Sequence, residues 1–228
     1  MSMDKGRPLG GYMKSQDIFL LLKLISLQQQ ENKSCASYLI EKNSPNVWEG
    51  WEIEEEDVAF QRESDQLAPH IFAARYTARG LESETGVSKS EVNLSLKRSI
   101  KVGLAKLDRK ANIPRANTKA LTEFIIYGLK YVFPAQVSEL SRGIPTSFAA
   151  PVLQGKVMSA GETIYIWSDA RGNSKGQAVE PLYKTVPTAV KKDPYLYEYL
   201  ALVDAIRLGN AREAGVAIDE LENKLRIA

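Results

Sequence analysis

The side chains in this sequence that could recognise a nucleic acid are gathered in a short basic stretch near residue 90. Asn93 and Lys97 stand one helical turn apart, so a helix would place them on one face, where they could pair with adenine and with guanine or a phosphate. Leu94 could touch a thymine methyl group. Residues 88–90 would lie at the start of the same helix, where free amides and the helix dipole favour a phosphate.

Basic residues continue beyond this helix into a segment rich in turn-forming residues. Residues 104–117 are predicted to form two short strands around a basic tip, that is, a small hairpin. Its basic side chains would contact the DNA backbone or minor groove, which positions a protein without specifying a base sequence. The candidate DNA-binding residues are Ser88, Lys89, Ser90, Asn93, Leu94, Lys97, Lys101, Arg109, Lys110 and Arg115.

Two predicted helices separated by a glycine turn would position these side chains. Thr77 is expected to cap a helix over residues 78–85, and Gly86 is expected to end that helix in the left-handed conformation. The order of helix, sharp turn, helix and basic hairpin is that of a winged helix-turn-helix, in which the second helix enters the major groove of DNA.

The second helix has its own start and stop signals. Ser88 and Glu91 have the spacing of a capping box, in which each side chain accepts a hydrogen bond from the other residue's backbone amide. Gly103 is predicted to end the helix. The core-facing side chains, which recur at every fourth position, are predicted to be Val92, Leu96 and Ile100.

The segment from Val87 to Ala105, with the sequence VSKSEVNLSLKRSIKVGLA, resembles the recognition-helix signature of winged helix-turn-helix transcriptional regulators, most nearly the MarR-like group. Its tripeptide VGL at 102–104 resembles that family's lead-in to the wing. The resemblance covers about a fifth of the chain and departs from the family at Ser99, where a core leucine is usual. It implies a homodimeric bacterial regulator of transcription that binds double-stranded DNA at a pseudo-palindromic operator.

Charge is unevenly distributed, although the formal net charge of the chain is only +2. Residues 41–68 contain nine acidic and two basic side chains, whereas residues 75–119 contain eleven basic and four acidic ones. Such a reversal bears on partners and association rates rather than on fold. The stretch 31–70 is therefore interpreted as an acidic insertion that could screen the DNA-binding face or contact a partner protein.

The N-terminal half is predicted to be a winged helix-turn-helix domain over residues 13–133, preceded by a flexible leader or cloning remnant at 1–12. Its first helix, from Ser15 to about Gln30, is apolar on nearly every side and is expected to be buried. Thr118 is expected to cap its last helix, which would follow the hairpin. The fold class expected for the whole chain is mainly α, with a small β-hairpin wing and a C-terminal helical extension.

The C-terminal half divides into two predicted segments. Residues 134–194 are rich in proline and glycine and predict an irregular region, in which a strand at 162–167 and a return strand at 178–183 could form a hairpin. Residues 195–228 predict a helical pair, which Asp193 would cap at its start.

The composition excludes several kinds of site. With one cysteine, Cys35, and one histidine, His70, the chain cannot form an internal disulfide or a Cys/His zinc site. No catalysis, cofactor or metal is expected. An enzyme acting on nucleic acid or nucleotide would need paired carboxylates for a metal, and the only weak candidates are Asp204 with Asp219 or Glu220. The apolar run at 18–27 is too short to span a membrane, so a cytoplasmic protein is expected.

A second interpretation keeps the winged domain but replaces DNA with a protein. The chain would then be an interaction module, such as an antitoxin or a defence-system component, and it would grip its partner through the acidic insertion, the apolar helix or the C-terminal helices. The salt dependence of DNA binding separates the two interpretations, because phosphate contacts release counterions.

Overall fold

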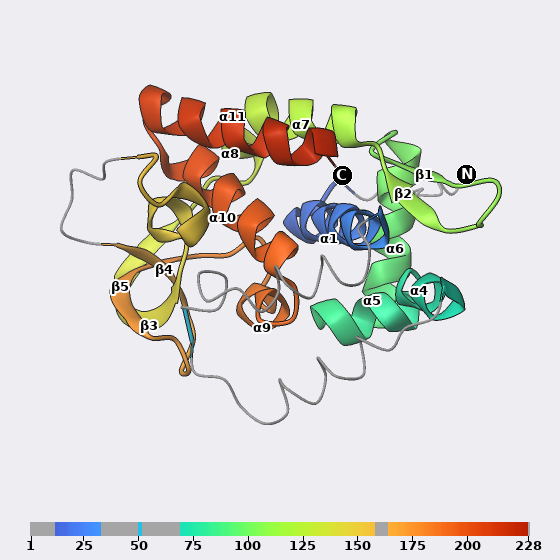
Figure 1. Ribbon diagram of the computed structural model, residues 1–228, viewed down its shortest axis with the longest axis horizontal. Coiled ribbons are helices and arrows are strands. Elements are labelled where there is room, and N and C mark those ends of the chain that lie inside the picture. Colours follow the sequence, from blue (N-terminus) through green and yellow to red (C-terminus); the bar gives the residue numbers. More distant parts are fainter. Residues whose placement is uncertain (1–11, 33–49, 52–68, 158–163, 228) are drawn as a thin grey trace, which may run out of the picture.

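Helices make up most of the chain, and two small β-sheets lie on opposite sides of them (Figure 1). The computed structural model describes residues 12–32, 50–51, 69–157 and 164–227. The mainly helical fold class with a small hairpin is thereby confirmed at that level of detail. Among the described residues no helix is both long enough and apolar enough to cross a membrane.

The first half of the chain forms the helices and the hairpin that the sequence predicts, together with a short helix at residues 69–75 that it does not predict. In chain order these elements are α1 (Ser15–Asn32), α4 (Pro69–Arg75), α5 (Ala78–Thr85), α6 (Lys89–Lys101), β1 (Ala105–Leu107), β2 (Pro114–Ala116) and α7 (Thr118–Phe124), which continues through a π-helical segment (Ile125–Leu129) into α8 (Lys130–Val132). Strands β1 and β2 pair in antiparallel register. The cap of α7 is Asn117, whose side chain accepts from the amide of Ala120, and not the expected Thr118.

The second half contains more regular structure than its proline and glycine content predicts. Its elements are β3 (Val137–Pro145), two 3₁₀ turns (Ser147–Ala149 and Pro151–Leu153), β4 (Tyr165–Ser168), β5 (Ser174–Val179), α9 (Val186–Val190), α10 (Pro194–Leu208) and α11 (Ala211–Ile227). Asp193 caps α10 as predicted, with its side chain accepting from the amide of Leu196 at 3.1 Å.

The expected hairpin at 162–183 is wrong in its pairing. Strands β4 and β5 run parallel to each other, and each pairs antiparallel with β3, so the three strands close into a small barrel. The barrel brings the backbones of Gly143 and Gly172 so close that a Cβ on Gly172 would lie 2.1 Å from Gly143. Glycine is needed there because a side chain has no room.

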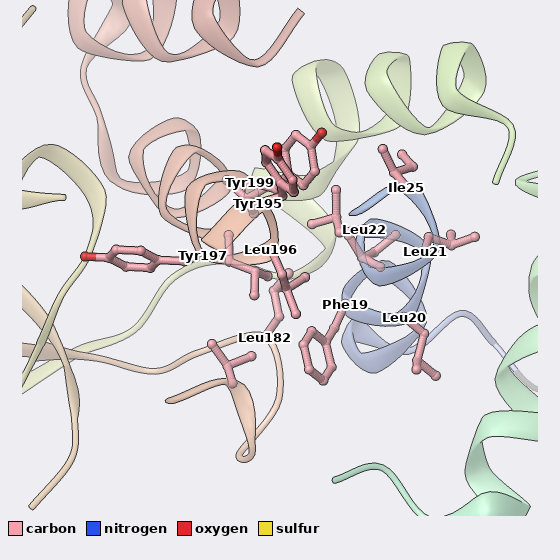
Figure 2. Close-up of a cluster of buried hydrophobic side chains, with 14 of the residues drawn as sticks. Phe19, Leu20, Leu21, Leu22, Ile25, Leu182, Tyr195, Leu196, Tyr197 and Tyr199 are labelled. Atoms are coloured by element: carbon pink, nitrogen blue, oxygen red, sulfur yellow. The ribbon is translucent and has the colours of Figure 1, made fainter. Parts of the chain in front are cut away.

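Helix α1 is the centre of the core and is buried on every side, as its apolar circumference predicts. Leu22 points from α1 toward Tyr195 and Leu196 of α10, and Phe19 points toward Leu182 (Figure 2). Helix α1 also contacts α6 and β2. A continuous hydrophobic cluster therefore joins the helix-turn-helix region to the C-terminal helices.

The residue pair Gly50 and Trp51 is attached to the barrel loop. The carbonyl of Gly50 accepts from the amide of Asn173 at 3.0 Å, and Trp51 forms a β-bridge with Gly172. The Trp51 ring is buried edge-on against Tyr197, with 5.8 Å between ring centroids. Core packing therefore accounts for Trp51, whereas Cys35, Trp48 and most of the acidic insertion lie outside the described residues.

Candidate nucleic-acid interface

Helices α5 and α6 and the turn between them form at the predicted signals. Thr77 caps α5 by accepting from the amide of Gly80 at 3.1 Å, and Gly86 ends α5 with a φ of 69°. A side chain at position 86 would be strained by this φ and would also press against Thr185, 3.0 Å away. Helix α6 then begins after Ser88, whose hydroxyl accepts from the amide of Glu91 at 3.4 Å.

Only half of the predicted capping box forms, because the Glu91 carboxylate is used elsewhere. It accepts from Gln16 Nε2 at 2.6 Å and from Lys14 Nζ at 3.4 Å, and both partners lie at the start of α1. The hydrogen bond from Gln16 lowers the pKa of the Glu91 carboxyl, and Lys14 adds to the effect. Glu91 thus fixes the beginning of α6 against α1.

The buried face of α6 differs from the predicted one. Val92 is buried as expected, but Ile100 is 43% exposed, and the fully buried positions near it are Ser95 and Ser99. Within the described residues neither of these two serine hydroxyls has a hydrogen-bond partner. Their small side chains let α1 and α6 pack closely, which turns Ile100 outward.

An ion pair fixes the last turns of α6 to α1 on this buried side. The Arg98 guanidinium donates to both oxygens of Asp17, at 2.9 and 2.6 Å, and the Asp17 carboxylate is fully buried. Bidentate pairs of this kind constrain orientation as well as distance. The outer face of α6 is therefore held at a fixed angle to the core.

That outer face carries the side chains that the sequence singles out. On α6 these side chains are all exposed to solvent: Lys89, Ser90, Asn93, Leu94, Lys97 and Lys101. Ser88, which precedes the helix, is also exposed. None of these side chains is packed inward, so this face of α6 is accessible to the major groove of a DNA duplex.

The predicted phosphate position at the start of α6 is partly filled by the chain itself. The amide of Lys89 donates to Glu82 Oε1 at 3.0 Å, and the amide of Glu91 donates to Ser88. A carboxylate satisfies a helix N-terminus in the way that a phosphate would. The Lys89 amide is therefore not free as expected, because Glu82 accepts from it, whereas the side chains of residues 88–90 remain exposed.

The hairpin presents two basic residues at its tip. Arg109 and Lys110 are exposed, and the turn that carries them is closed by Asp108, which accepts from the amides of Lys110 and Ala111 at 2.8 Å each. These backbone hydrogen bonds lower the pKa of the Asp108 carboxyl. Asn112 completes the turn with a φ of 53°.

Arg115 faces the body of the protein and not the hairpin surface. Its Nη1 atom lies 2.7 Å from the Tyr76 hydroxyl and 2.8 Å from a Glu31 carboxylate oxygen. The guanidinium also stacks on the Tyr76 ring at 4.9 Å, and burial raises the pKa of the Tyr76 phenol. The prediction that Arg115 contacts DNA is therefore corrected, because its donors are engaged by α1 and Tyr76.

Arg109 and Arg115 should consequently behave differently when each is replaced by alanine. We expect Arg109→Ala to reduce by about 1 the slope of log affinity against log salt, since one phosphate contact is lost. Arg115→Ala should instead lower the free energy of unfolding by about 1–3 kcal/mol, because it removes charged hydrogen bonds. Salt titrations and urea unfolding of both variants measure this, and equal salt slopes would contradict the assignment.

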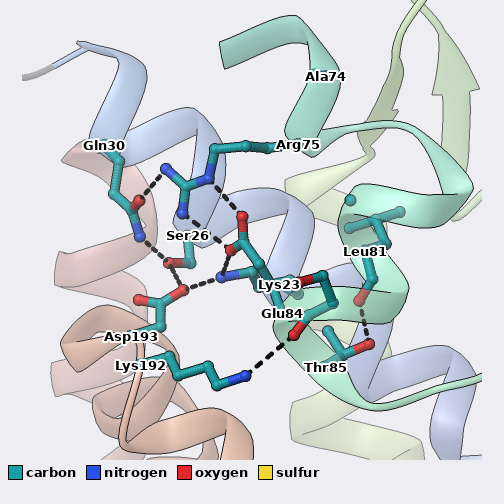
Figure 3. A network of polar contacts seen from close by, with 12 residues as sticks. Lys23, Ser26, Gln30, Ala74, Arg75, Leu81, Glu84, Thr85, Lys192 and Asp193 are labelled. Atoms are coloured by element: carbon teal, nitrogen blue, oxygen red, sulfur yellow. Dashed lines mark hydrogen bonds and ion pairs between the residues drawn. The ribbon is translucent and has the colours of Figure 1, made fainter. Parts of the chain in front are cut away.

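Helix α5 is held by a buried polar network that the sequence analysis missed (Figure 3). Lys23 of α1 is completely buried, and its Nζ contacts Glu84 of α5 and, at 2.6 Å, Asp193. Arg75 of α4 donates to both oxygens of Glu84, at 2.5 and 2.9 Å. The available signal was a single lysine within an apolar helix, because a buried charge requires partners.

The same network extends along α1. The Ser26 hydroxyl donates to Asp193 at 2.5 Å and accepts from Gln30 Nε2 at 3.0 Å, and Gln30 Oε1 accepts from Arg75 at 2.8 Å. Burial opposes ionisation of the Glu84 carboxyl, but the charges of Lys23 and Arg75 outweigh it and lower its pKa from 4.5 to about 2. Positions of α1, α4, α5 and α10 are thus coupled.

Two of the three carboxylates considered for a metal, Asp204 and Glu220, are engaged with other partners. Asp204 is fully buried and accepts from Trp167 Nε1 at 2.7 Å and Thr146 at 3.1 Å, and Arg207 donates to its second oxygen at 2.7 Å. Glu220 pairs with Lys156 at 2.7 Å. In the part of the chain that the structure describes, no group of three or more His, Cys, Asp or Glu side chains could hold a metal ion.

No family model matches this chain, and no curated protein or solved structure is significantly similar to it.

Proposed function

We propose that this chain is a homodimeric, sequence-specific regulator of transcription that binds double-stranded DNA through a winged helix-turn-helix. The observation that carries the proposal is the exposed face of α6, on which Asn93, Leu94 and Lys97 project. The other side of this helix is fixed to Gln16 and Asp17 of α1. Rigid presentation suits base reading, because contacts to base edges require fixed geometry.

Each element has a distinct role in this proposal. Helix α6 enters the major groove, where Asn93 and Lys97 read base edges and Lys89 and Lys101 approach the flanking phosphates. The hairpin places Arg109 and Lys110 on the backbone or in the minor groove. The excess of basic residues between positions 75 and 119 attracts the duplex and raises the association rate. The resemblance of residues 87–105 to MarR-like regulators also supports this function.

Selection of bound duplexes from a random DNA pool tests the proposal. We expect the selected sequences to share a two-fold symmetric motif, and we expect their affinity to fall steeply as salt is raised, since phosphate contacts release counterions. Enrichment of no sequence, together with an affinity independent of salt, would contradict a role in DNA binding.

A protein-interaction module is the second candidate, and the same surface supplies the observation that favours it. Ile100, Val102 and Leu107 are exposed large apolar side chains near the end of α6 and on β1, and Glu82 adds an acidic group at the start of α6. Apolar side chains of this kind are typical of protein contacts. Loss of binding to a co-purified protein on Val102→Asp, with no DNA selected, would favour this candidate.

A further inference from the structure

A groove with a volume of about 660 Å³ lies between the start of α7 and the end of α11. These two helices run side by side in opposite directions across the top of the molecule in Figure 1. Ile126, Tyr127 and Leu225 give the groove apolar lining, and charged side chains stand at its edges. The groove is not part of the face proposed to bind DNA.

Large apolar side chains continue from this groove along the same helix. Tyr127 and Tyr131 are 75% and 81% exposed, and Val132 beside them is also exposed. The helix takes a π-helical course at Ile125–Leu129, a feature that often marks functional positions. Tyrosine is enriched at protein interfaces, where its ring buries a large area with little loss of side-chain entropy.

The charges on the groove walls are arranged in a self-complementary order. On α7, Lys119 precedes Glu123 by one turn; on α11, Glu222 precedes Arg226 by one turn, and these last two side chains pair at 3.3 Å. Because the helices are antiparallel (Figure 1), both bases lie toward one end of the groove and both acids toward the other. A two-fold axis across the groove would set the basic end of one copy on the acidic end of the next.

We propose that this groove is the surface through which two copies of the chain form a symmetric dimer. The occupant of each groove is the α7 and α11 edge of the second copy, and Tyr127 and Tyr131 become buried between them. Lys119 of each copy faces Glu222 of the other. The inference rests on the proposed function, which includes a homodimer, and it adds the location of the dimer interface. Its test measures dimerisation and not DNA binding.

The same contact would fix the spacing of the two DNA-binding faces. Helix α7 starts directly after β2, and the amide of Asn117 donates to the carbonyl of Leu104 at 2.8 Å, so the groove is attached to the base of the hairpin. A two-fold axis at the groove therefore relates the two α6 helices as well. Their separation then determines the distance between half-sites.

Charge reversal across the groove tests the pairing. We expect Lys119→Glu and Glu222→Lys each to raise the dimer dissociation constant at least tenfold in sedimentation equilibrium, because like charges then face each other at both ends. An equimolar mixture of the two variants should form a heterodimer with close to wild-type affinity, since opposite charges are restored in both pairs. Lys175→Glu, a charge reversal at an exposed position of β5, should leave the dimer unchanged.

Three results would overturn this interface. The first is a wild-type chain that stays monomeric up to roughly 100 µM, so that the groove is not occupied by a second copy. The second is a pair of single variants that each dimerise like the wild type. The third is a mixture of the two variants that does not recover the dimer. A fault in folding alone would not be corrected by mixing. DNA binding by the wild type is measured separately, so an intact dimer that selects no DNA overturns only the proposed function.

Discussion

Replacement of Lys23 by methionine is expected to lower the free energy of unfolding by about 3–5 kcal/mol, because it leaves buried carboxylates without their shared cation. Glu84 and Asp193 both contact the Lys23 ammonium, and all three side chains are buried. Methionine fills most of the volume of the lysine side chain, so the loss would report the charge and not a cavity. Urea unfolding at pH 7 measures this effect.

Lys224→Met is the matched control for this prediction. Lys224 pairs with Glu198 at 2.8 Å, but both side chains are about one quarter exposed. Pairs in contact with water contribute little, so a loss of about 1 kcal/mol or less is expected. Equal losses in the free energy of unfolding for the two variants would show that burial does not increase the contribution of the Lys23 ion pairs to stability.

The pH dependence of stability gives a second measurement on the same network. The pKa of Glu84 is about 2 in the folded protein, compared with an ordinary value of 4.5. A lowered carboxyl pKa stabilises the fold fully above about pH 4.5, and this contribution is lost as the pH falls toward 2. The difference in stability between the wild type and Lys23→Met should therefore narrow between pH 5 and pH 3. An unchanged difference would contradict the ion pair as its source.

The double variant Asn93→Ala, Lys97→Ala is expected to bind the selected duplex on the order of a hundredfold more weakly than the wild type. Each base contact contributes about 1–3 kcal/mol, and both side chains are exposed on one face of α6. Affinity for a scrambled duplex should fall much less, since only part of the Lys97 contribution can come from phosphate. Fluorescence anisotropy at fixed salt compares the two duplexes.

Lys175→Ala controls for the loss of a positive charge in this experiment. Lys175 is exposed on β5, in the barrel, and should not affect either duplex. If the double variant loses the same affinity for selected and scrambled DNA, α6 does not read base edges. The preference for the selected duplex, which would then be unchanged, would have to come from the hairpin.

Local signals predicted the helix boundaries well. Thr77, Gly86, Ser88 and Asp193 all act as the sequence predicts, because a cap depends on residues within one turn of it. At the start of α11, Asn210 and Glu213 form a reciprocal capping pair of the same local kind. Exposure of Asn93, Leu94 and Lys97 on α6 also follows from helical periodicity, whereas exposure of Ile100 does not.

Contacts between distant segments could not be predicted in this way. Glu91 has the local spacing of a capping box, yet Gln16, 75 positions earlier, takes its carboxylate. Arg115 looks like a wing residue in sequence, but its partners Tyr76 and Glu31 lie in other elements. Strand β3 combines Gly143 and Pro145 with a largely exposed first half, so it has no alternating pattern to reveal it. In each case tertiary partners outweigh the local pattern.

The double use of Asp193 has a consequence for cutting the protein into parts. One oxygen of this carboxylate starts α10, and the other accepts from Lys23 and Ser26 of α1. A fragment spanning residues 69–133 would keep α5, α6 and the hairpin but lose α1 and, with it, the Lys23 ammonium that contacts Glu84. We therefore expect the α5–α6 pair not to be excisable as an autonomous module, and the intact chain to melt as a single cooperative unit.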